Sequence, residues 1–219
     1  MKQKSYIILF YAFIVTIALY LVENFYHPVY ILQMAQKILT FVLIPILAWY
    51  IWKTQVGKFG LIGKGSLRYG VGFGILSVWI ITLAYYFLRE SIDWQAIRFS
   101  VNARGVNETT FLLAFAYIMF GNSLVEEYFF RGVIFRNAWD MSAIFAYILS
   151  ALMFSLYHIT IFGTWFSGFV LWLALFGLFV GGLFFAWLYK KTGGIWWAWI
   201  FHIFADLTIL VIGYIEIFS

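Results

Sequence analysis

Long apolar stretches alternate with short polar ones along this chain of 219 residues. Most of the apolar stretches are close to the roughly 20 residues that an α-helix needs to cross the hydrocarbon core of a bilayer. The pattern predicts an all-α fold, a polytopic membrane helix bundle with about seven to eight transmembrane helices. The predicted spans are residues 6–22, 29–52, 69–88, 110–135, 143–159, 165–189 and 195–218.

Two segments depart from this regular pattern. Gln33, Gln36 and Lys37 interrupt the start of the second span. Pro45 should kink the middle of the same span, so we expect this helix to be tilted or broken. The stretch 89–108 is the most polar part of the chain, and the apolar residues among its charges suit a helix that lies along the membrane surface.

Composition supports a lipid environment. Hydrophobic residues make up 65% of the chain and charged residues only 11%, whereas soluble domains are about half apolar and about a quarter charged. The chain has no cysteine, which excludes disulfides, thiolate metal sites and a cysteine nucleophile. The net charge of +5 does not indicate nucleic-acid binding, because the basic residues cluster between apolar spans, where membrane topology accounts for them.

The distribution of basic residues predicts the orientation. Cytoplasmic loops of membrane proteins carry an excess of Lys and Arg. An amino terminus in the cytoplasm gives that excess, so we expect a multi-pass protein of the cell membrane with a cytoplasmic amino terminus. The basic residues on the cytoplasmic side are then Lys2, Lys4, Lys53, Lys58, Lys64, Arg68, Arg131, Arg136, Lys190 and Lys191, and those opposite are Lys37, Arg89, Arg98 and Arg104.

Glycines suggest two further features of the sixth span. Gly193 and Gly194 should let the chain turn after Lys191. Gly177 and Gly181 lie four residues apart on one helical face, which should allow a neighbouring helix to approach closely.

Ionisable residues inside apolar spans are the first candidates for function, because each costs about 2.5–3.5 kcal/mol on insertion scales. His27 lies in a connecting segment and is treated as incidental. A lone buried acid or imidazole often serves only hydrogen bonds between helices. In this chain three separate spans contribute such groups, which favours a shared hydrolytic site. The residues are Glu126, Glu127, His158, His202 and Asp206.

Helical spacing separates the roles of the two glutamates. Glu127 and Arg131 are four residues apart and share a face, so they can form a charge pair, and Glu127 is the orienting group. Glu126 points about 100° away, with Asn122 one turn earlier on its own face. Glu126 is therefore the better candidate for a general base.

The histidines complete the candidate site. His158 can hold and deprotonate a water molecule next to the base. His202 and Asp206 are four residues apart on one face, where they can stabilise an oxyanion or orient one another.

The order Glu-Glu-x-x-x-Arg, then Phe-x-x-x-His, then His-x-x-x-Asn or Asp resembles the CAAX protease and bacteriocin-processing (CPBP) family, also called Abi. The resemblance covers roughly residues 110–210, and segment 177–194 is similar to the family's intervening glycine-bearing motif. We therefore divide the chain into N-terminal transmembrane helices with a surface segment, 1–109, and a catalytic core, 110–219. The motif residues are Glu126, Glu127, Arg131, Phe154, His158, His202 and Asp206.

The resemblance implies a membrane-embedded endopeptidase of the glutamate type that needs no cofactor. Glu126 and His158 would activate water, and His202 with Asp206 would stabilise the oxyanion. Because the best-known eukaryotic members have Asn where this chain has Asp206, that carboxyl is either protonated or orients His202. The supporting residues would be Glu127, Arg131 and Asn122.

The resemblance also bears on partners. Eukaryotic relatives trim prenylated CAAX proteins, whereas many bacterial relatives are linked to peptide maturation, bacteriocin processing or self-immunity. This compact chain looks like the prokaryotic branch. The expected partners are a peptide or lipid-anchored protein substrate and membrane lipid, and no nucleic acid.

Other functions remain open at this point. A zinc protease could use Glu126, His158 and His202 as ligands, although the chain has no His-Glu-x-x-His. A serine peptidase would need Gly-x-Ser-Gly, which Ser123 lacks, and an aspartyl peptidase would need Gly-x-Gly-Asp, which is absent. A proton-coupled transporter could use buried acids and histidines as a relay. A non-catalytic immunity or scaffold protein of the same fold is the last alternative.

Overall fold

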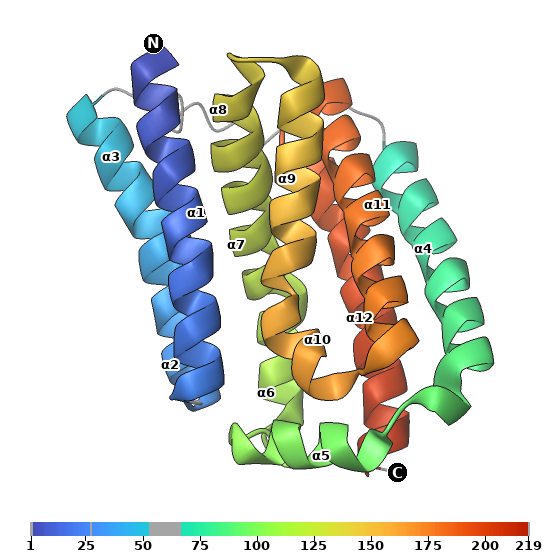
Figure 1. The fold of residues 1–219 in the computed structure, drawn as a ribbon. Helices are drawn as coiled ribbons and strands as arrows, with labels where there is room; N and C mark the ends of the chain where they lie inside the picture. Colours follow the sequence, from blue (N-terminus) through green and yellow to red (C-terminus); the bar gives the residue numbers. More distant parts are fainter. Residues whose placement is uncertain (1, 27, 53–66, 219) are drawn as a thin grey trace.

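The computed structural model describes residues 2–26, 28–52 and 67–218, and the elements in these ranges are helices. Most of them stand side by side in a bundle, and the short helix α5 (Trp94–Ala103) lies across one end (Figure 1). The predicted all-α membrane helix bundle is confirmed. Four residues with predicted positions lie outside the described residues: His27, Lys53, Lys58 and Lys64.

The amino-terminal half contains α1 (Lys2–Phe25), α2 (Tyr30–Lys37), the π-helix η1 (Ile38–Leu43), α3 (Ile44–Trp52), α4 (Leu67–Leu88), the short 3-10 helix η3 (Arg89–Ser91) and α5. The carboxyl-terminal half contains α6 (Phe111–Ala116), the π-helix η4 (Tyr117–Asn122), α7 (Ser123–Glu127), the π-helix η5 (Tyr128–Phe135), α8 (Arg136–Trp139), α9 (Ala143–Tyr157), α10 (Ile159–Trp165), α11 (Gly168–Thr192) and α12 (Trp196–Phe218).

The helices that can cross a membrane are fewer than predicted. Among the described residues, five are long and apolar enough, or six if the bent pair of α9 and α10 counts as one span. The predicted span 110–135 falls in a helical run from α6 to α8 that contains the buried charges of Glu126, Glu127 and Arg131. The count of seven to eight is not confirmed. The five helices are Ser5–Phe25, Tyr30–Ile51, Leu67–Ser91, Gly168–Thr192 and Trp196–Phe218.

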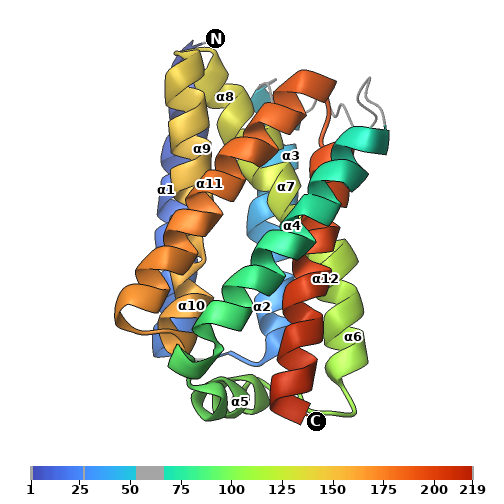
Figure 2. The same ribbon diagram turned by 90° about the vertical axis from the view of Figure 1, so that its right-hand side faces the viewer.

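Different elements lie at the two ends of the bundle. The amino terminus, the start of α4 and the end of α11 lie at one end, and α5 lies at the other (Figures 1 and 2). The position of α5 across the helix ends suits the predicted surface helix. The helix begins with an exposed cap, in which the Asp93 side chain accepts a hydrogen bond from the backbone N–H of Ala96.

The second span is continuous rather than broken. Residues Tyr30–Ile51 form one membrane-length helix that widens into η1 directly before Pro45. Proline lacks an N–H and its ring crowds the preceding turn, so a wide turn at this point accommodates it. The widening begins one residue after Lys37, which is buried with 7% of its surface exposed.

Aromatic stacking fixes this second span against the rest of the bundle. The ring of Phe41 in η1 stacks on that of Phe129 in η5 with 3.8 Å between ring centres, and both side chains are fully buried. Phe41 also meets the edge of Tyr157 at the end of α9, at 5.4 Å between centres. Such buried aromatic pairs contribute about 0.5–1.5 kcal/mol beyond their burial. They determine how the start of the second span is presented to α7.

Glycines in α4 let that helix lie along α12 (Figure 2). A Cβ added to Gly74 would lie 2.6 Å from the Phe204 ring, and one added to Gly70 would lie 3.1 Å from the Ile200 side chain. Both glycines are buried. The small residues at this four-residue spacing therefore determine how closely α4 packs against the helix that carries His202.

The glycines of α11 act differently from the prediction. Open space lies beside Gly177 and Gly181, so neither serves close helix packing, and that expectation is wrong. The packing glycine is Gly182, where an added Cβ would lie 2.9 Å from the Cα of Ala151 in α9. The face of α11 that α9 covers is thus rotated by one residue. The predicted turn after α11 is confirmed, because Gly193 ends the helix in the left-handed conformation at φ +74°.

We predict that Gly182→Val lowers the free energy of unfolding by about 1–3 kcal/mol, because the new side chain overpacks the backbone of α9. Gly181→Val is the matched control, since it makes the same change in helix propensity beside open space. Thermal unfolding of both variants in detergent measures the difference. Equal midpoints for the two variants would contradict the packing described above.

Candidate active site

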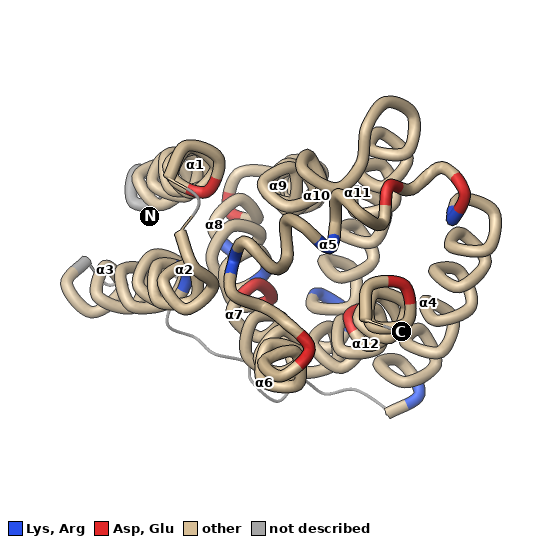
Figure 3. The backbone as a smooth tube through the Cα atoms, turned by 90° about the horizontal axis from the view of Figure 1, so that it is seen from below, with Lys and Arg blue, Asp and Glu red and all other residues tan. Residues whose placement is uncertain are grey.

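Glu126 lies in a short regular stretch of helix between two wide turns. The π-helices η4 and η5 flank α7 on both sides, and Glu126 is 1% exposed. Wide turns of this kind change the direction in which the following side chains point, and they are frequent at functional sites. Figure 3 looks along the helices and colours basic residues blue. The basic position of α2, Lys37, lies on the side of that helix that faces α7.

The two carboxylate oxygens of Glu126 have different surroundings. Oε1 accepts hydrogen bonds from Nδ2 of Asn122 at 2.8 Å and from Nζ of Lys37 at 3.4 Å. Oε2 is buried and has no hydrogen-bond partner within the described part of the chain. It lies 3.7 Å from Nε2 of His158 and 3.9 Å from Nε2 of His202. These separations exceed a direct hydrogen bond and suit groups that share a third atom.

His158 is held at a break between two helices. It lies between α9 and α10, which meet at a bend of 44°, so it sits inside a bent span rather than at the end of one. Its Nδ1 lies 2.8 Å from the carbonyl oxygen of Phe154. Because a carbonyl can only accept, Nδ1 carries the hydrogen and Nε2 is the atom that faces Glu126.

His202 is held in place by Glu127, the residue that follows Glu126 in the chain. Its Nδ1 lies 2.9 Å from Oε1 of Glu127, and the same oxygen accepts a hydrogen bond from Nη1 of Arg131 at 3.0 Å. The Arg131 guanidinium lies over the rings of Phe154 and Phe185, at 4.5 and 4.6 Å from their centres. The pair of Glu127 and Arg131 is completely buried. It therefore orients the imidazole of His202 toward Glu126.

Asp206 lies beside His202, one turn further along α12. Its Oδ1 is 3.6 Å from Nε2 of His202, and its Oδ2 is buried without a hydrogen-bond partner among the described residues. Nε2 of His202 is therefore flanked by two carboxyl groups, those of Asp206 and Glu126. Both carboxyl groups therefore approach the ring nitrogen that Glu127 does not contact.

Residues 108–208 match the family model described as type II CAAX prenyl endopeptidase Rce1-like. This part of the chain is similar to the Rce1-like family. The resemblance to the CPBP family, of which these endopeptidases are part, is thus confirmed. The Rce1-like segment, residues 108–208, includes each acid and imidazole described above. No match was found among curated proteins or among solved structures.

The family match and the candidate spans together support a multi-pass membrane protein with a segment similar to a family of proteases. Among the predicted residues, the structure brings together Asn122, Glu126, His158, His202 and Asp206, with Glu127 and Arg131 directly behind His202. The side chains come from three parts of the Rce1-like segment: α7 with its flanking turns, the α9–α10 break, and α12.

Sequence reasoning missed Lys37, which lies outside the Rce1-like segment. Lys37 was noted only as a polar interruption of the second span and as one of the cations opposite the cytoplasmic side, yet it is buried and donates to both Asn122 and Glu126. A signal was available, because a lysine within an apolar span is as costly as a buried acid. Its partner lies 89 positions away in sequence, and nothing in the local pattern indicates the contact.

Ser123, considered for a serine mechanism, faces away from this site. Its hydroxyl donates to the carbonyl oxygen of Met119 at 2.5 Å and accepts a hydrogen bond from Nε1 of Trp199 at 3.0 Å. The first contact lies within the same helical run, the second joins that run to α12, and neither reaches Glu126. The side chain is therefore a packing and hydrogen-bonding residue in this structure.

The zinc alternative lacks a preformed ligand group. Within the part of the chain that the structure describes, no three His, Asp or Glu side chains are arranged to hold a metal ion. This includes the set Glu126, His158 and His202, whose facing atoms lie 3.7 and 3.9 Å apart. Zinc binding by these residues stays a prediction without support from the donor geometry.

Proposed function

We propose that this protein is an intramembrane endopeptidase that hydrolyses a peptide bond in a membrane-associated peptide or protein. The observation that carries the proposal is the Oε2 atom of Glu126, which is buried, lacks a hydrogen-bond partner among the described residues and faces Nε2 of His158 and of His202. A carboxylate between two imidazoles is a suitable general base for water. The Rce1-like match supports the same chemistry.

In the proposed reaction, a water molecule lies against Oε2 of Glu126 and the Nε2 lone pair of His158. Glu126 takes one proton from the water as its oxygen bonds to the carbonyl carbon of the scissile peptide. The same proton passes to the peptide nitrogen as the carbon–nitrogen bond breaks. The hydroxyl of the water thus ends on the new carboxyl group and its proton on the new amine, and Glu126 returns to its starting form.

His202 is proposed to stabilise the oxyanion that forms on the carbonyl oxygen. A protonated ring can donate from Nε2, while Nδ1 remains bonded to Glu127. Asp206 stands 3.6 Å from that Nε2, which supports a role in orienting and charging His202 rather than in contacting the oxyanion. Arg131, through Glu127, holds the ring in place. In a site shielded from water such fixed donors act more strongly than at a surface.

We further propose that the protein resides in the cell membrane with its amino terminus in the cytoplasm, and that it works without a cofactor. The bias of basic residues supports the orientation. A peptide or lipid-anchored protein is the proposed substrate class, because the site lies within apolar helices and the matching family acts on CAAX proteins. Peptide maturation, including bacteriocin processing, is a related use of the same chemistry.

The proposal is tested by comparing the peptides in membranes that contain the wild type or Glu126→Gln. This change keeps the size of the side chain and removes the base. We expect peptides with new termini only in the wild type. Ser123→Ala is the control and should give the wild-type peptides, since Ser123 does not contact the site. Identical peptides from wild type and Glu126→Gln, with the biological effect intact, would instead support the scaffold alternative.

A further inference from the structure

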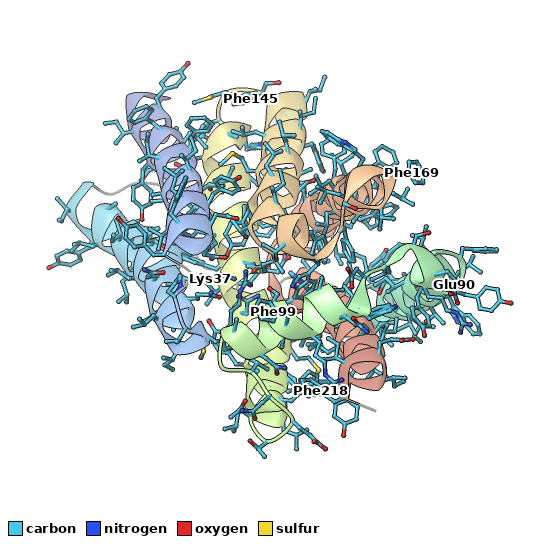
Figure 4. The ribbon with its side chains drawn as sticks, turned by 60° about the horizontal axis from the view of Figure 1, so that its bottom comes forward. Lys37, Glu90, Phe99, Phe145, Phe169 and Phe218 are labelled. Carbon is cyan, nitrogen blue, oxygen red and sulfur yellow. The ribbon has the colours of Figure 1, made fainter. Side chains whose placement is uncertain are left out.

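Lys37 is a buried cation that reaches the proposed general base from outside the Rce1-like segment. It is the last residue of α2, and its side chain lies between that helix and the helical run that contains α7 (Figure 4). Its Nζ lies 2.8 Å from Oδ1 of Asn122 and 3.4 Å from Oε1 of Glu126, and 5.0 Å from the centre of the Tyr157 ring. The ammonium group is thus enclosed by an amide, a carboxylate and an aromatic ring.

The position of Lys37 is fixed by packing on both sides. Phe41, one turn later, is stacked on Phe129 and is fully buried. Gln33, one turn earlier on the same face, is also buried and donates to the carbonyl oxygen of Pro28 within its own segment. Only Lys37 among these three reaches Glu126. A buried lysine is costly unless it is paired, so the ion pair with Glu126 offsets the cost of burying Lys37.

The contacts of Lys37 determine which end of the Asn122 amide faces Glu126. Lys37 donates to Oδ1 of Asn122, and this leaves Nδ2 of Asn122 to donate to Oε1 of Glu126. The opposite amide orientation would place NH₂ against the ammonium group and Oδ1 against the carboxylate, which is unfavourable at both contacts. Lys37 therefore holds Oε1 of Glu126 directly and also through Asn122.

We infer that Lys37 is a positioning residue, which anchors Glu126 by one carboxylate oxygen so that the other is presented to His158 and His202. The inference rests on the proposed function for its catalytic meaning. The anchored oxygen, Oε1, has two donors, whereas Oε2 has none among the described residues. Without Lys37 the carboxylate keeps only the donor of Asn122, whose amide has lost the cation that orients it, so the second oxygen loses the fixed approach to the two imidazoles.

The kinetic test uses protein reconstituted in liposomes and a fluorescence-quenched farnesylated peptide that ends in a CAAX sequence. Lys37→Met is expected to lower kcat by about 10²-fold with KM unchanged, because a small misplacement of a catalytic group has that effect. Lys37→Arg should recover most of the lost rate, since it restores a cation. Gln33→Met, a buried polar residue on the same face, is the matched control with wild-type kcat. Wild-type kcat in Lys37→Met would overturn the inference.

A stability test measures the contact between Lys37 and Glu126 without a substrate. Thermal unfolding midpoints are measured for Lys37→Met, Glu126→Gln and the double variant. Lys37→Met alone leaves the Glu126 charge buried without its cation, so the midpoint should fall, and the fall should be smaller in the Glu126→Gln background. Additive shifts would overturn the inference. Non-additive shifts in a protein that cleaves no peptide would keep the anchor and remove only the proposed function.

Discussion

Replacing Arg131 with methionine is expected to lower the free energy of unfolding by about 3–5 kcal/mol, because it leaves a buried carboxylate without its cation. The partner, Glu127, is completely buried and has no exposure to water through which its charge could be screened. The variant also loses the contacts of the guanidinium with the rings of Phe154 and Phe185. Chemical or thermal unfolding in a mild detergent measures the loss.

Arg136→Met is the matched control for this prediction. Arg136 forms an ion pair at the same spacing, with Asp140 at 3.2 Å, but a third of its side chain is exposed. Pairs of this kind contribute about 0–1 kcal/mol. A similar loss in the two variants would show that burial of the Glu127–Arg131 pair does not determine its contribution. In Arg131→Met, cleavage should fall as well, since His202 loses the group that holds Glu127 in place.

His158→Ala is expected to lower kcat by about 10²-fold, because the variant loses a group that positions the attacking water. The ring holds one hydrogen bond, to the carbonyl oxygen of Phe154, and turns Nε2 toward Oε2 of Glu126. Its loss removes a partner for the attacking water while the base itself stays in place. Cleavage of the farnesylated CAAX peptide by reconstituted protein gives kcat, and the unfolding midpoint checks that the helices remain assembled.

Thr164→Ala serves as the control in the same region. Thr164 is an exposed residue of α10, and its hydroxyl bonds only to the carbonyl oxygen of Ile161 in the same helix. Its replacement should leave kcat and the midpoint close to wild type. If His158→Ala retains more than half of the wild-type kcat, the imidazole does not position the attacking water, and the proposed pairing of Glu126 with His158 fails.

Much of the fold is predictable because a bilayer imposes a simple length requirement. The helices α1, α4, α11 and α12 are predominantly apolar stretches of membrane-spanning length, and their positions agree with the predicted spans to within a few residues. The bend at His158 was not predicted. Residues 159–165 continue the same span beyond it, and their polar and apolar order gives no sign of a change in direction.

The parts of the site that could be predicted are those in which partners lie one helical turn apart. Glu127 with Arg131 and Asn122 with Glu126 follow from a four-residue spacing. Contacts across helices are different, because a single rotation of one helix changes all of them. For this reason the sequence does not predict that Gly182, rather than Gly181, packs on α9. The contact of Lys37 with Glu126 could not be predicted for the same reason.

The wide turns on both sides of α7 add a second difficulty. A regular helix advances about 100° per residue, and a π-helical turn takes one residue more than a regular one. Projections based on regular spacing therefore lose accuracy over η4 and η5. The short α7 stretch keeps regular spacing locally, which is why the relation between Asn122 and Glu126 was still predicted correctly.

The burial of three charges in the helical run from α6 to α8 has a consequence for biogenesis. Glu126, Glu127 and Arg131 together add about 8–10 kcal/mol to the free energy of inserting this segment alone on insertion scales. Entry of this segment into the bilayer therefore depends on partner helices, and one of them, α12 with the imidazole of His202, is synthesised after it. Membrane integration of the nascent chain and maturation of its reactive centre become one event, so a partly made chain carries no active site.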